Sequence, residues 1–400
     1  MQTGNQFEVV RDARARARQL AEVPPGPEEL SRLAYAGKLL PSAQRTLFLD
    51  GSWAFATRPI ARGSRVRPLP PSDKELRDIA IRSRGAHFDL TDYISRNRVA
   101  GLLITHRGGV VQEYYDLGLS PDTRWISMSV AKSVSTTLVG VAIQEGLIGG
   151  VDDPLTDYLP QLEGSSYEGV SVRQLLQMTS GVKWDDTHTD PASERRRMLE
   201  LQIAQRPGAI LDFVAHLPRV APAGSIWNYS TAETHVVGAL VHATTGRWLC
   251  DYLSEKIWAP FGMQSDATWW LESPGGLEVA GSGIHATLRD YARFGLFLMN
   301  DGLIDGKRVL PERWVQQATA PLAIQGKRVD YGYMWWPVPN IDGSFADGAF
   351  GARGIFGQFI YVNPRAEVVI AVCSSRSKPK FAEAIVDNDF FNGVVQALYE

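Results

Sequence analysis

Apolar residues recur along this chain at two spacings, which predict strands in some regions and helices in others. Val99 to Thr105 and Val110 to Tyr115 are two β-rich runs joined by His106-Arg107-Gly108-Gly109, a pattern that predicts a β-hairpin. The next region has a spacing of about four, typical of a helix buried along one side. Its apolar positions are Val130, Val134, Leu138, Val141 and Ala142.

The same reasoning extends to the rest of the chain. Helices with loops dominate the prediction for residues 151–280, where Ser171 and Gln174 match a capping box. The later expected elements are a helix over Ala286–Asn300, strands in Tyr331–Val338 and Phe359–Cys373, and a closing helix over Phe381–Tyr399. The N-terminal hairpin and the C-terminal strands can complete one antiparallel sheet.

These elements predict an α/β (α+β) fold in which helices flank an antiparallel sheet and a mostly helical subdomain is added. The expected organisation is an N-terminal arm over 1–75, an α/β domain from 76–150 and 281–400, and a helical subdomain over 151–280. The arm has a predicted helix carrying Arg11, Arg14, Arg16 and Arg18, followed by a break at Pro24-Pro25-Gly26-Pro27.

Composition narrows the function classes. With 44% hydrophobic and 21% charged residues, the chain has the make-up of a globular protein, and its formal net charge of −3 gives no case for nucleic acid or an anionic membrane as a partner. Only two cysteines occur, and the first residues contain no apolar signal segment. We therefore expect a cytoplasmic protein; its oligomeric state is open, a homodimer included.

Candidate chemistry begins at Ser129, one helical turn before Lys132 at the start of the buried helix. Residues three apart share a helix face, and a serine needs an adjacent base to become a nucleophile. Three further Ser-x-x-Lys matches begin at Ser180, Ser375 and Ser377, in a turn or a polar run, so only Ser129 opens a helix. The alternative for Ser129 is a simple N-cap residue.

Two later segments can supply the other groups that such a serine requires. Tyr229 lies just before another expected helix, where a nearby lysine can lower its pKa and make it a proton shuttle, or it is simply a core residue. The glycine-rich segment 351–358 leads into a strand, so the N–H of Gln358 and that of Ser129 can form an oxyanion hole. A β-bulge is the alternative for this segment.

Other residues are candidate ligand contacts. Aromatic residues around these motifs can line an apolar cleft or belong to the core; they are Trp184, Trp227, Trp335, Trp336, Phe350 and Phe356. Asp185, Asp186, His188 and Asp190 can in principle ligate a metal, although acidic loops are usually solvated. No phosphate loop or dinucleotide fingerprint occurs, and we expect neither a metal nor a cofactor.

The ordered motifs resemble the serine β-lactamase and penicillin-recognising superfamily over residues from about 85 to 400. The chain looks closest to the class C-like branch, which includes family VIII carboxylesterases and 6-aminohexanoate-dimer hydrolases. The segments similar to the nylon-oligomer hydrolases are Trp53-Ala54-Phe55, Met128–Ser133, Asp190–Glu194 and Gly357-Gln358.

The resemblance implies that Ser129 is acylated, Lys132 is its base, Tyr229 shuttles a proton, and the N–H groups of Ser129 and Gln358 hold the oxyanion. It also suggests Trp184, His188, Trp336, Phe356 and Gly357 as substrate contacts. The superfamily's Lys-Thr-Gly motif reads Ile355-Phe356-Gly357 here, so its carboxylate-gripping cation is missing. The tyrosine and asparagine that assist amide hydrolysis in the nylon-dimer enzymes align with His188 and Gly281.

These differences from the superfamily's motifs set the order of the predicted functions. A serine hydrolase that forms an acyl-enzyme on small carboxylic esters comes first, a linear amide hydrolase of the 6-aminohexanoate-dimer type second, and a β-lactamase third. An acyltransferase is a variation on the same chemistry. A non-catalytic ligand-binding protein on the same fold is the alternative of another class.

Overall fold

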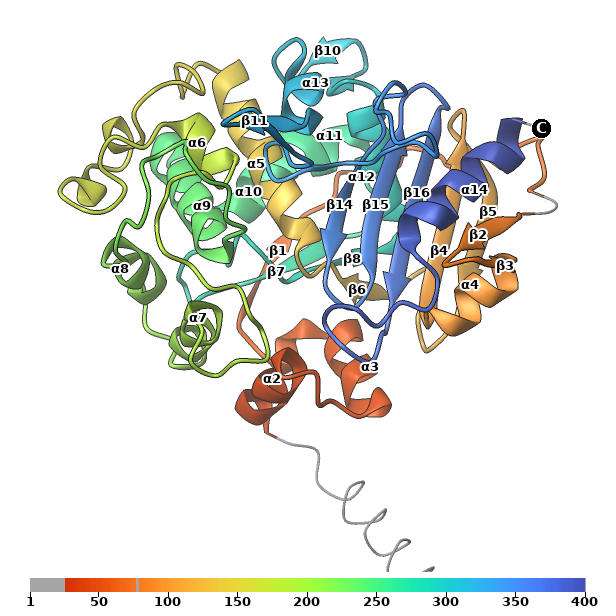
Figure 1. Cartoon of the computed structure of the whole chain (residues 1–400), viewed down its shortest axis with the longest axis horizontal. Helices are drawn as coiled ribbons and strands as arrows, with labels where there is room; N and C mark the ends of the chain where they lie inside the picture. Colours follow the sequence, from red (N-terminus) through yellow and green to blue (C-terminus); the bar gives the residue numbers. More distant parts are fainter. Residues whose placement is uncertain (1–25, 77–78, 400) are drawn as a thin grey trace, which may run out of the picture.

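A six-stranded antiparallel sheet is the largest sheet of the computed structural model, which describes residues 26–76 and 79–399 (Figure 1). In sheet order its strands are β13 (Trp336–Pro337), β14 (Phe350–Gly354), β15 (Gln358–Asn363), β16 (Val368–Ser374), β4 (Val99–His106) and β5 (Gly109–Tyr115). Because β16 pairs with β4, the N-terminal hairpin and the C-terminal strands complete one sheet, as predicted. The helix expected around Arg11–Arg18 lies outside the described residues.

Both faces of this sheet are covered by helices. Leu103 belongs to the same core cluster as Phe297 of α12 (Leu288–Met299), whereas its neighbour Leu102 belongs to the cluster of Phe390 on α14 (Asp387–Tyr399). Alternate residues of a strand point to opposite faces, so the nearly continuous apolar run of β4 fills two cores. Figure 1 shows α14 in front of the sheet and α12 behind it.

A second, four-stranded sheet brings distant segments together below the nucleophile helix. Its order is β1 (Thr57–Ile60), β7 (Ala267–Trp270), β8 (Ile284–Thr287) and β6 (Arg124–Ile126). Strands of three or four residues show too little alternation of apolar and polar positions to be predicted, so this sheet was not expected. β6 ends three residues before Ser129 and therefore fixes where the following helix begins.

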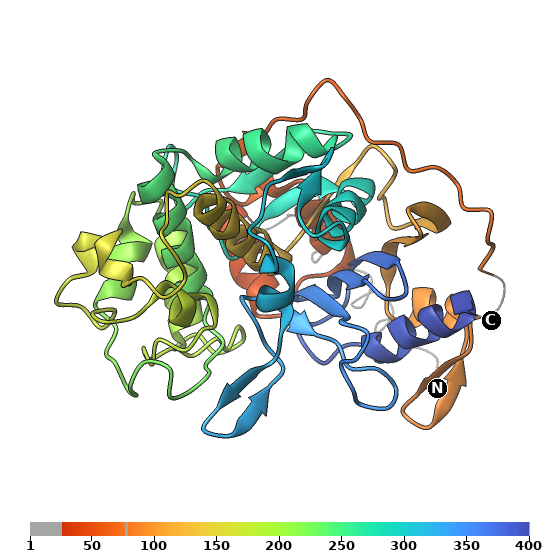
Figure 2. The same cartoon turned by 90° about the horizontal axis from the view of Figure 1, so that it is seen from above.

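Helix α5 (Val130–Gln144) lies between the sheet and a group of helices (Figures 1 and 2). Its predicted apolar residues are all buried, and so are the polar side chains from Lys132 to Thr137, whereas Gln144 in its last turn is exposed. The neighbouring helices are α6 (Val172–Leu176), α7 (Glu194–Ile203), α8 (Ala209–Ala215), α9 (Thr231–Thr245) and α10 (Leu249–Leu253). The capping box of Ser171 and Gln174 is confirmed at the start of α6.

Three predicted elements differ from the structure. Only Trp336 and Pro337 of the run Tyr331–Val338 form a strand, because the preceding residues turn, with Met334 at φ +58°, while their aromatic rings fill the core. The closing helix begins at Asp387 rather than Phe381, whose side chain is 92% exposed. The strands in Phe359–Cys373 are confirmed as β15 and β16, and the helix over Ala286–Asn300 as α12, which is shorter.

The remaining elements complete the surface. They are α2 (Pro27–Tyr35), α3 (Pro41–Leu49), α4 (Leu90–Arg96), α11 (Ala259–Phe261), α13 (Trp314–Thr319), β2 (Ile81–Ser83), β3 (Ala86–Phe88), β9 (Leu303–Ile304), β10 (Lys307–Arg308), β11 (Leu322–Ile324) and β12 (Lys327–Val329). The β11–β12 hairpin projects from the body (Figure 2). Within the described ranges, no helix combines the length and apolarity needed to cross a membrane.

Candidate active site

Ser129 lies at the first turn of α5, and its hydroxyl is not used to cap that helix. The side chain makes no capping hydrogen bond, so the alternative of a simple N-cap serine is wrong. The preceding Met128 has φ +45°, a conformation that non-glycine residues rarely adopt and that is often found where a reactive side chain is presented. The sharp turn between β6 and α5 leaves the hydroxyl free to interact with other groups.

Lys132 is the nearest of these groups. Its Nζ donates to Ser129 Oγ at 3.3 Å and to the carbonyl oxygen of Gly281 at 2.9 Å, while the side chain is only 2% exposed. Burial lowers the pKa of Lys132 to about 7, although Asp186 opposes this shift. A substantial fraction of the amine is therefore neutral near pH 7 and able to accept the serine proton.

Tyr229 completes a close group with these two residues. The Lys132 Nζ lies 5.4 Å from the centre of the Tyr229 ring, and the phenol also interacts with the Ser129 hydroxyl. We expected a lowered pKa for Tyr229, but burial and the nearby Asp186 raise it. The expectation was wrong because packing around the half-buried ring disfavours the charged form of the phenol, which therefore stays neutral and can donate a proton or a hydrogen bond.

The glycine-rich segment forms the tight β14–β15 hairpin beside the nucleophile. The two strands pair in regular register from Phe350↔Val362 to Gly354↔Gln358, so this segment contains no β-bulge. A Cβ atom at Gly354 would lie 2.6 Å from the carbonyl oxygen of Ser127, which shows how closely the hairpin approaches the chain just before Ser129. The Gln358 amide side chain is held by Trp125 Nε1 at 3.0 Å.

A cavity of about 480 Å³ opens at this group. Its walls include Ser129, Asp186, His188, Trp227, Tyr229, Trp336, Arg353, Gly354, Ile355, Gly357, Phe359, Arg376, Pro379, Lys380, Phe381, Glu383, Val386, Asp387 and Asn388. Of the five expected substrate contacts, Trp336, His188 and Gly357 line this cavity. The structure thus brings together one nucleophile candidate, one amine, one phenol and an aromatic wall.

The other two expected contacts lie elsewhere. Phe356 is buried in the core, where its ring packs 5.3 Å from that of Phe48, because the hairpin turn directs it away from the cavity. Trp184 is also buried, and its indole N–H donates to Asp186 at 2.9 Å. Trp184 therefore positions a cavity residue without lining the cavity itself.

Asp186 was considered only as a metal ligand, and the structure places it in the cavity wall. Its Oδ1 accepts a hydrogen bond from Thr231 at 2.7 Å, whereas its Oδ2 is buried without a hydrogen-bond partner among the described residues. Burial would raise the pKa of Asp186, but His188, Lys132 and Arg195 together hold it below its usual value. Its negative charge therefore faces the buried amine.

The acidic loop around Asp186 does not gather its side chains around one point. Asp185 and Asp190 accept backbone hydrogen bonds within the loop, from Thr187 and Ala192. Over residues 26–76 and 79–399, no group of three or more His, Cys, Asp and Glu side chains could hold a metal ion. Burial lowers the pKa of His188 to about 3, so its ring is neutral, and it stacks on Tyr35 with centroids 5.6 Å apart.

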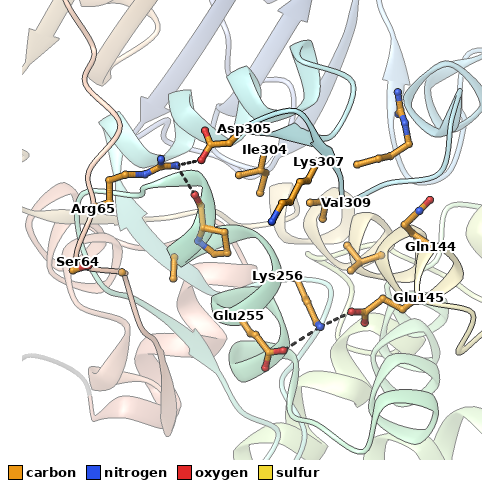
Figure 3. Close-up of a pocket in the computed structure, with 15 residues that line it drawn as sticks. Ser64, Arg65, Gln144, Glu145, Glu255, Lys256, Ile304, Asp305, Lys307 and Val309 are labelled. Atoms are coloured by element: carbon orange, nitrogen blue, oxygen red, sulfur yellow. Dashed lines mark hydrogen bonds and ion pairs between the residues drawn. The ribbon is translucent and has the colours of Figure 1, made fainter.

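A second cavity, of about 550 Å³, lies at the other end of α5 (Figure 3). Figure 3 shows Lys256 between Glu145 and Glu255, and Arg65 directed toward Asp305. Its labelled charged residues are therefore largely paired with one another, and no nucleophile lies beside a base.

Comparison with known proteins agrees with this architecture. The Beta-lactamase family model matches residues 91–390. The 6-aminohexanoate-dimer hydrolase of Paenarthrobacter ureafaciens is 31% identical over 346 residues, which cover 82% of this chain and 86% of that protein.

Solved structures share the fold. A Bacillus anthracis protein named as a candidate 6-aminohexanoate-dimer hydrolase superposes with a TM-score of 0.74 at 24% identity, covering 89% of this chain and 92% of that one. A family VIII carboxylesterase gives a TM-score of 0.59 at 18% identity, covering 76% and 92%. With three quarters of its length matched by the family model and a relative above 30% identity, this chain belongs to the beta-lactamase family and is a serine hydrolase of that fold.

Proposed function

We propose that the protein hydrolyses small carboxylic esters through an acyl-enzyme on Ser129. One observation carries this proposal: a lysine amine buried from solvent, with a pKa of about 7, donates to the Ser129 hydroxyl at 3.3 Å. A neutral amine in that position can remove the serine proton, which is what a weak oxygen nucleophile requires.

The proposed reaction has two halves. As Ser129 Oγ attacks the carbonyl carbon, its proton moves to Lys132, and the developing oxyanion is held by the N–H groups of Ser129 and Gln358. The ester C–O bond then breaks, and the leaving alcohol receives a proton through the neutral phenol of Tyr229. In the second half, a water molecule gives one proton to Lys132 as its oxygen attacks the acyl carbon. The bond between that carbon and Ser129 Oγ then breaks, the carboxylic acid is released, and the proton taken from water restores the Ser129 hydroxyl.

Esters are favoured over amides because an amine leaving group needs more help with protonation. The position that resembles the assisting asparagine is Gly281, which has no side chain, and a Cβ atom there would lie 3.0 Å from Lys132 Nζ. His188, at the position of the assisting tyrosine, carries a neutral ring rather than a phenol. Both differences weaken proton delivery to a leaving nitrogen.

Linear amide hydrolysis is the second candidate. The observation that favours it is the 31% identity to a relative whose name is 6-aminohexanoate-dimer hydrolase. β-Lactam hydrolysis ranks third, because the Lys-Thr-Gly cation is replaced by Ile355. A non-catalytic ligand-binding protein on the same fold would not require the Ser129–Lys132 pair.

The test combines covalent labelling with a substrate panel. A fluorophosphonate probe should modify the protein at Ser129 and fail to modify Ser129→Ala, while Ser64→Ala, at the cavity of Figure 3, keeps full labelling. Turnover of a short-chain p-nitrophenyl ester, 6-aminohexanoate dimer and a chromogenic cephalosporin then ranks the three substrate classes. Labelling that persists in Ser129→Ala, or a wild-type protein that is never labelled, would refute the proposal.

A further inference from the structure

Three cationic side chains line the cavity that contains Ser129, together with the carboxylates of Asp186, Glu383 and Asp387. Arg353 comes from β14, whereas Arg376 and Lys380 come from the loop between β16 and α14. The resemblance to the superfamily pointed to a missing cation at Ile355. The structure supplies positive charge to the same cavity from other positions.

Arg376 is already neutralised. It is buried, and it donates to the carboxylate of Asp387 at 3.0 Å, with Glu383 4.0 Å away. Glu383 in turn pairs with Arg84 at 3.0 Å. Both carboxylates therefore form ion pairs with arginines other than Arg353, although the charge of Asp387 also acts on Arg353.

Arg353 differs from Arg376 because it forms no ion pair with a described carboxylate. Its guanidinium donates to the amide oxygen of Asn388 at 3.0 Å and lies 5.4 Å from the centre of the Trp336 ring. Its Nε is buried and has no hydrogen-bond partner among the described residues. Asp387 and Asp330 act on its charge electrostatically, but no described carboxylate forms an ion pair with its guanidinium. A guanidinium offers five donors, so Arg353 keeps unused capacity beside the cavity.

Lys380 adds a second unpaired charge at the cavity mouth. Its side chain is exposed, forms no ion pair with any described residue, and places Nζ 6.0 Å from the centre of the Tyr229 ring. Its charge also reaches Lys132 and His188, whose pKa values it lowers. Lys380 therefore faces the reacting groups rather than the solvent alone.

We propose that the natural substrate carries a carboxylate, which Arg353 and Lys380 hold while its ester group lies against Ser129. This inference rests on the proposed function and names its substrate class. Arg353 provides the planar fork that matches a carboxylate, and Lys380 provides a mobile charge that attracts the anion to the mouth. The apolar rings of Trp336 and Tyr229 accommodate the chain between the two groups.

The test uses two pairs of esters that differ by one charge. The p-nitrophenyl monoester of adipic acid is compared with p-nitrophenyl hexanoate, which puts the carboxylate on the acyl side. The p-carboxyphenyl and p-carbamoylphenyl esters of butyric acid put it on the leaving group. Because charge-assisted hydrogen bonds are worth about 1.5–3 kcal/mol, we expect the anionic member of one pair to have a kcat/KM about 10-fold higher or more at low salt.

Variants assign this preference to the two cations. Arg353→Met and Lys380→Met should each lower the anionic-to-neutral ratio several-fold, and added salt should lower the wild-type ratio. Arg82→Met and Lys327→Met, which remove exposed cations outside the cavity, should keep it. Lys380 is exposed, so its variant stays informative even if Arg353→Met folds poorly.

The outcomes separate this inference from the proposed function. Neutral esters turned over in a Ser129-dependent way with no preference for either anionic partner would overturn the carboxylate site and leave the esterase intact. A preference that survives both cavity substitutions would also overturn it. No ester turnover together with no fluorophosphonate labelling would refute the esterase and the carboxylate site with it.

Discussion

The two ends of helix α5 each open into a cavity, and the two cavities differ in chemistry far more than in size. With 15 residues the helix is about 22 Å long, with Ser129 at its start and Glu145 just after its end. The cavity at the Ser129 end measures about 480 Å³ and that at the Glu145 end about 550 Å³. Volume alone would therefore favour the end that lacks the Ser129–Lys132 pair.

Pairing of charges is what separates them. At the Glu145 end, Lys256 lies between two glutamates, and Arg65 and Asp305 meet at 2.7 Å with more than half of each side chain exposed. At the Ser129 end, Lys132 is buried and none of the described carboxylates lies within ion-pair distance. Exposed pairs contribute little, whereas a buried unpaired amine is costly and is retained where it reacts.

The helix dipole strengthens this contrast. The first turn of α5 carries partial positive charge from unpaired N–H groups, which favours a developing oxyanion at Ser129. The last turn carries partial negative charge, and there Glu145 needs Lys256 beside it. The Ser129 end of α5 thus favours a developing negative charge, whereas at the other end Lys256 balances the negative charge of Glu145.

The largest expected effect comes from Ser129→Ala. Removing the nucleophile should lower kcat for p-nitrophenyl butyrate by a factor on the order of 10³ or more, because the acyl-enzyme can no longer form. Lys307→Met, at the cavity of Figure 3, is the matched change at the opposite end and should keep the wild-type rate. Equal losses in the two variants would mean that the comparison of the cavities is wrong.

Loss of the amine should come next. Lys132→Ala should slow turnover by roughly 10² to 10⁴ because proton transfer from Ser129 loses its acceptor. In the wild type, kcat/KM should rise with pH and level off above about 7, since only the neutral amine accepts a proton. A flat profile between about pH 5 and 9 would assign the base to another group.

Tyr229→Phe should have a smaller effect of about 10². The phenol is neutral because burial raises its pKa, so it acts as a donor and its removal impairs proton delivery to the leaving alcohol. Esters of alcohols with high pKa should suffer more than p-nitrophenyl esters, whose leaving group needs little protonation. A uniform loss across leaving groups would contradict this role.

The sequence predicted this end of α5 much better than it predicted its surroundings. The pattern Ser129-x-x-Lys132 and the apolar spacing of the helix are local, so they identified the element and the pair of residues. Arg353 and Lys380 reach the cavity through a hairpin and an irregular loop, and no spacing in the sequence relates them to Ser129. Phe356 looked like a ligand contact for the same reason: a turn decides which side chain faces the cavity.

The fold shows the same division. Long strands such as β4 and β16 were predicted because their apolar runs are continuous. The four-stranded sheet instead depends on short segments far apart in the sequence, such as Thr57 and Trp270, which are separated by 213 positions. The direction of the Tyr229 pKa shift was also wrong, because it is set by burial that only the packed structure reveals. The sequence thus predicted which reactive residues lie together, but not the burial that sets their pKa values.

Stability should respond oppositely to changes at the two ends. The pKa of Lys132 falls from 10.5 unfolded to about 7 folded, so the folded state binds fewer protons between these values. Its penalty of roughly 4 to 5 kcal/mol is present in full below about pH 7 and disappears as the pH rises toward 10.5. Lys132→Met should therefore be more stable than the wild type at pH 6.5 by a few kcal/mol, after a loss of about 1 kcal/mol for the hydrogen bond to Gly281.

Urea unfolding at about pH 6.5 and 9.5 measures this difference. The gain of Lys132→Met over the wild type should shrink at the higher pH, where the wild-type amine is neutral in the folded state. A gain that does not change with pH would show that packing, rather than the buried charge, separates the two proteins.

The smallest effect is expected from Lys256→Met at the other end of the helix. Its partners Glu145 and Glu255 are 32% and 43% exposed, so solvent screens both interactions and the free energy of unfolding should fall by no more than about 1 kcal/mol. That loss should shrink in high salt, and ester turnover should match the wild type. A loss of several kcal/mol, insensitive to salt, would mean that the Glu145 end also depends on a buried charge, and the distinction between the two cavities would fail.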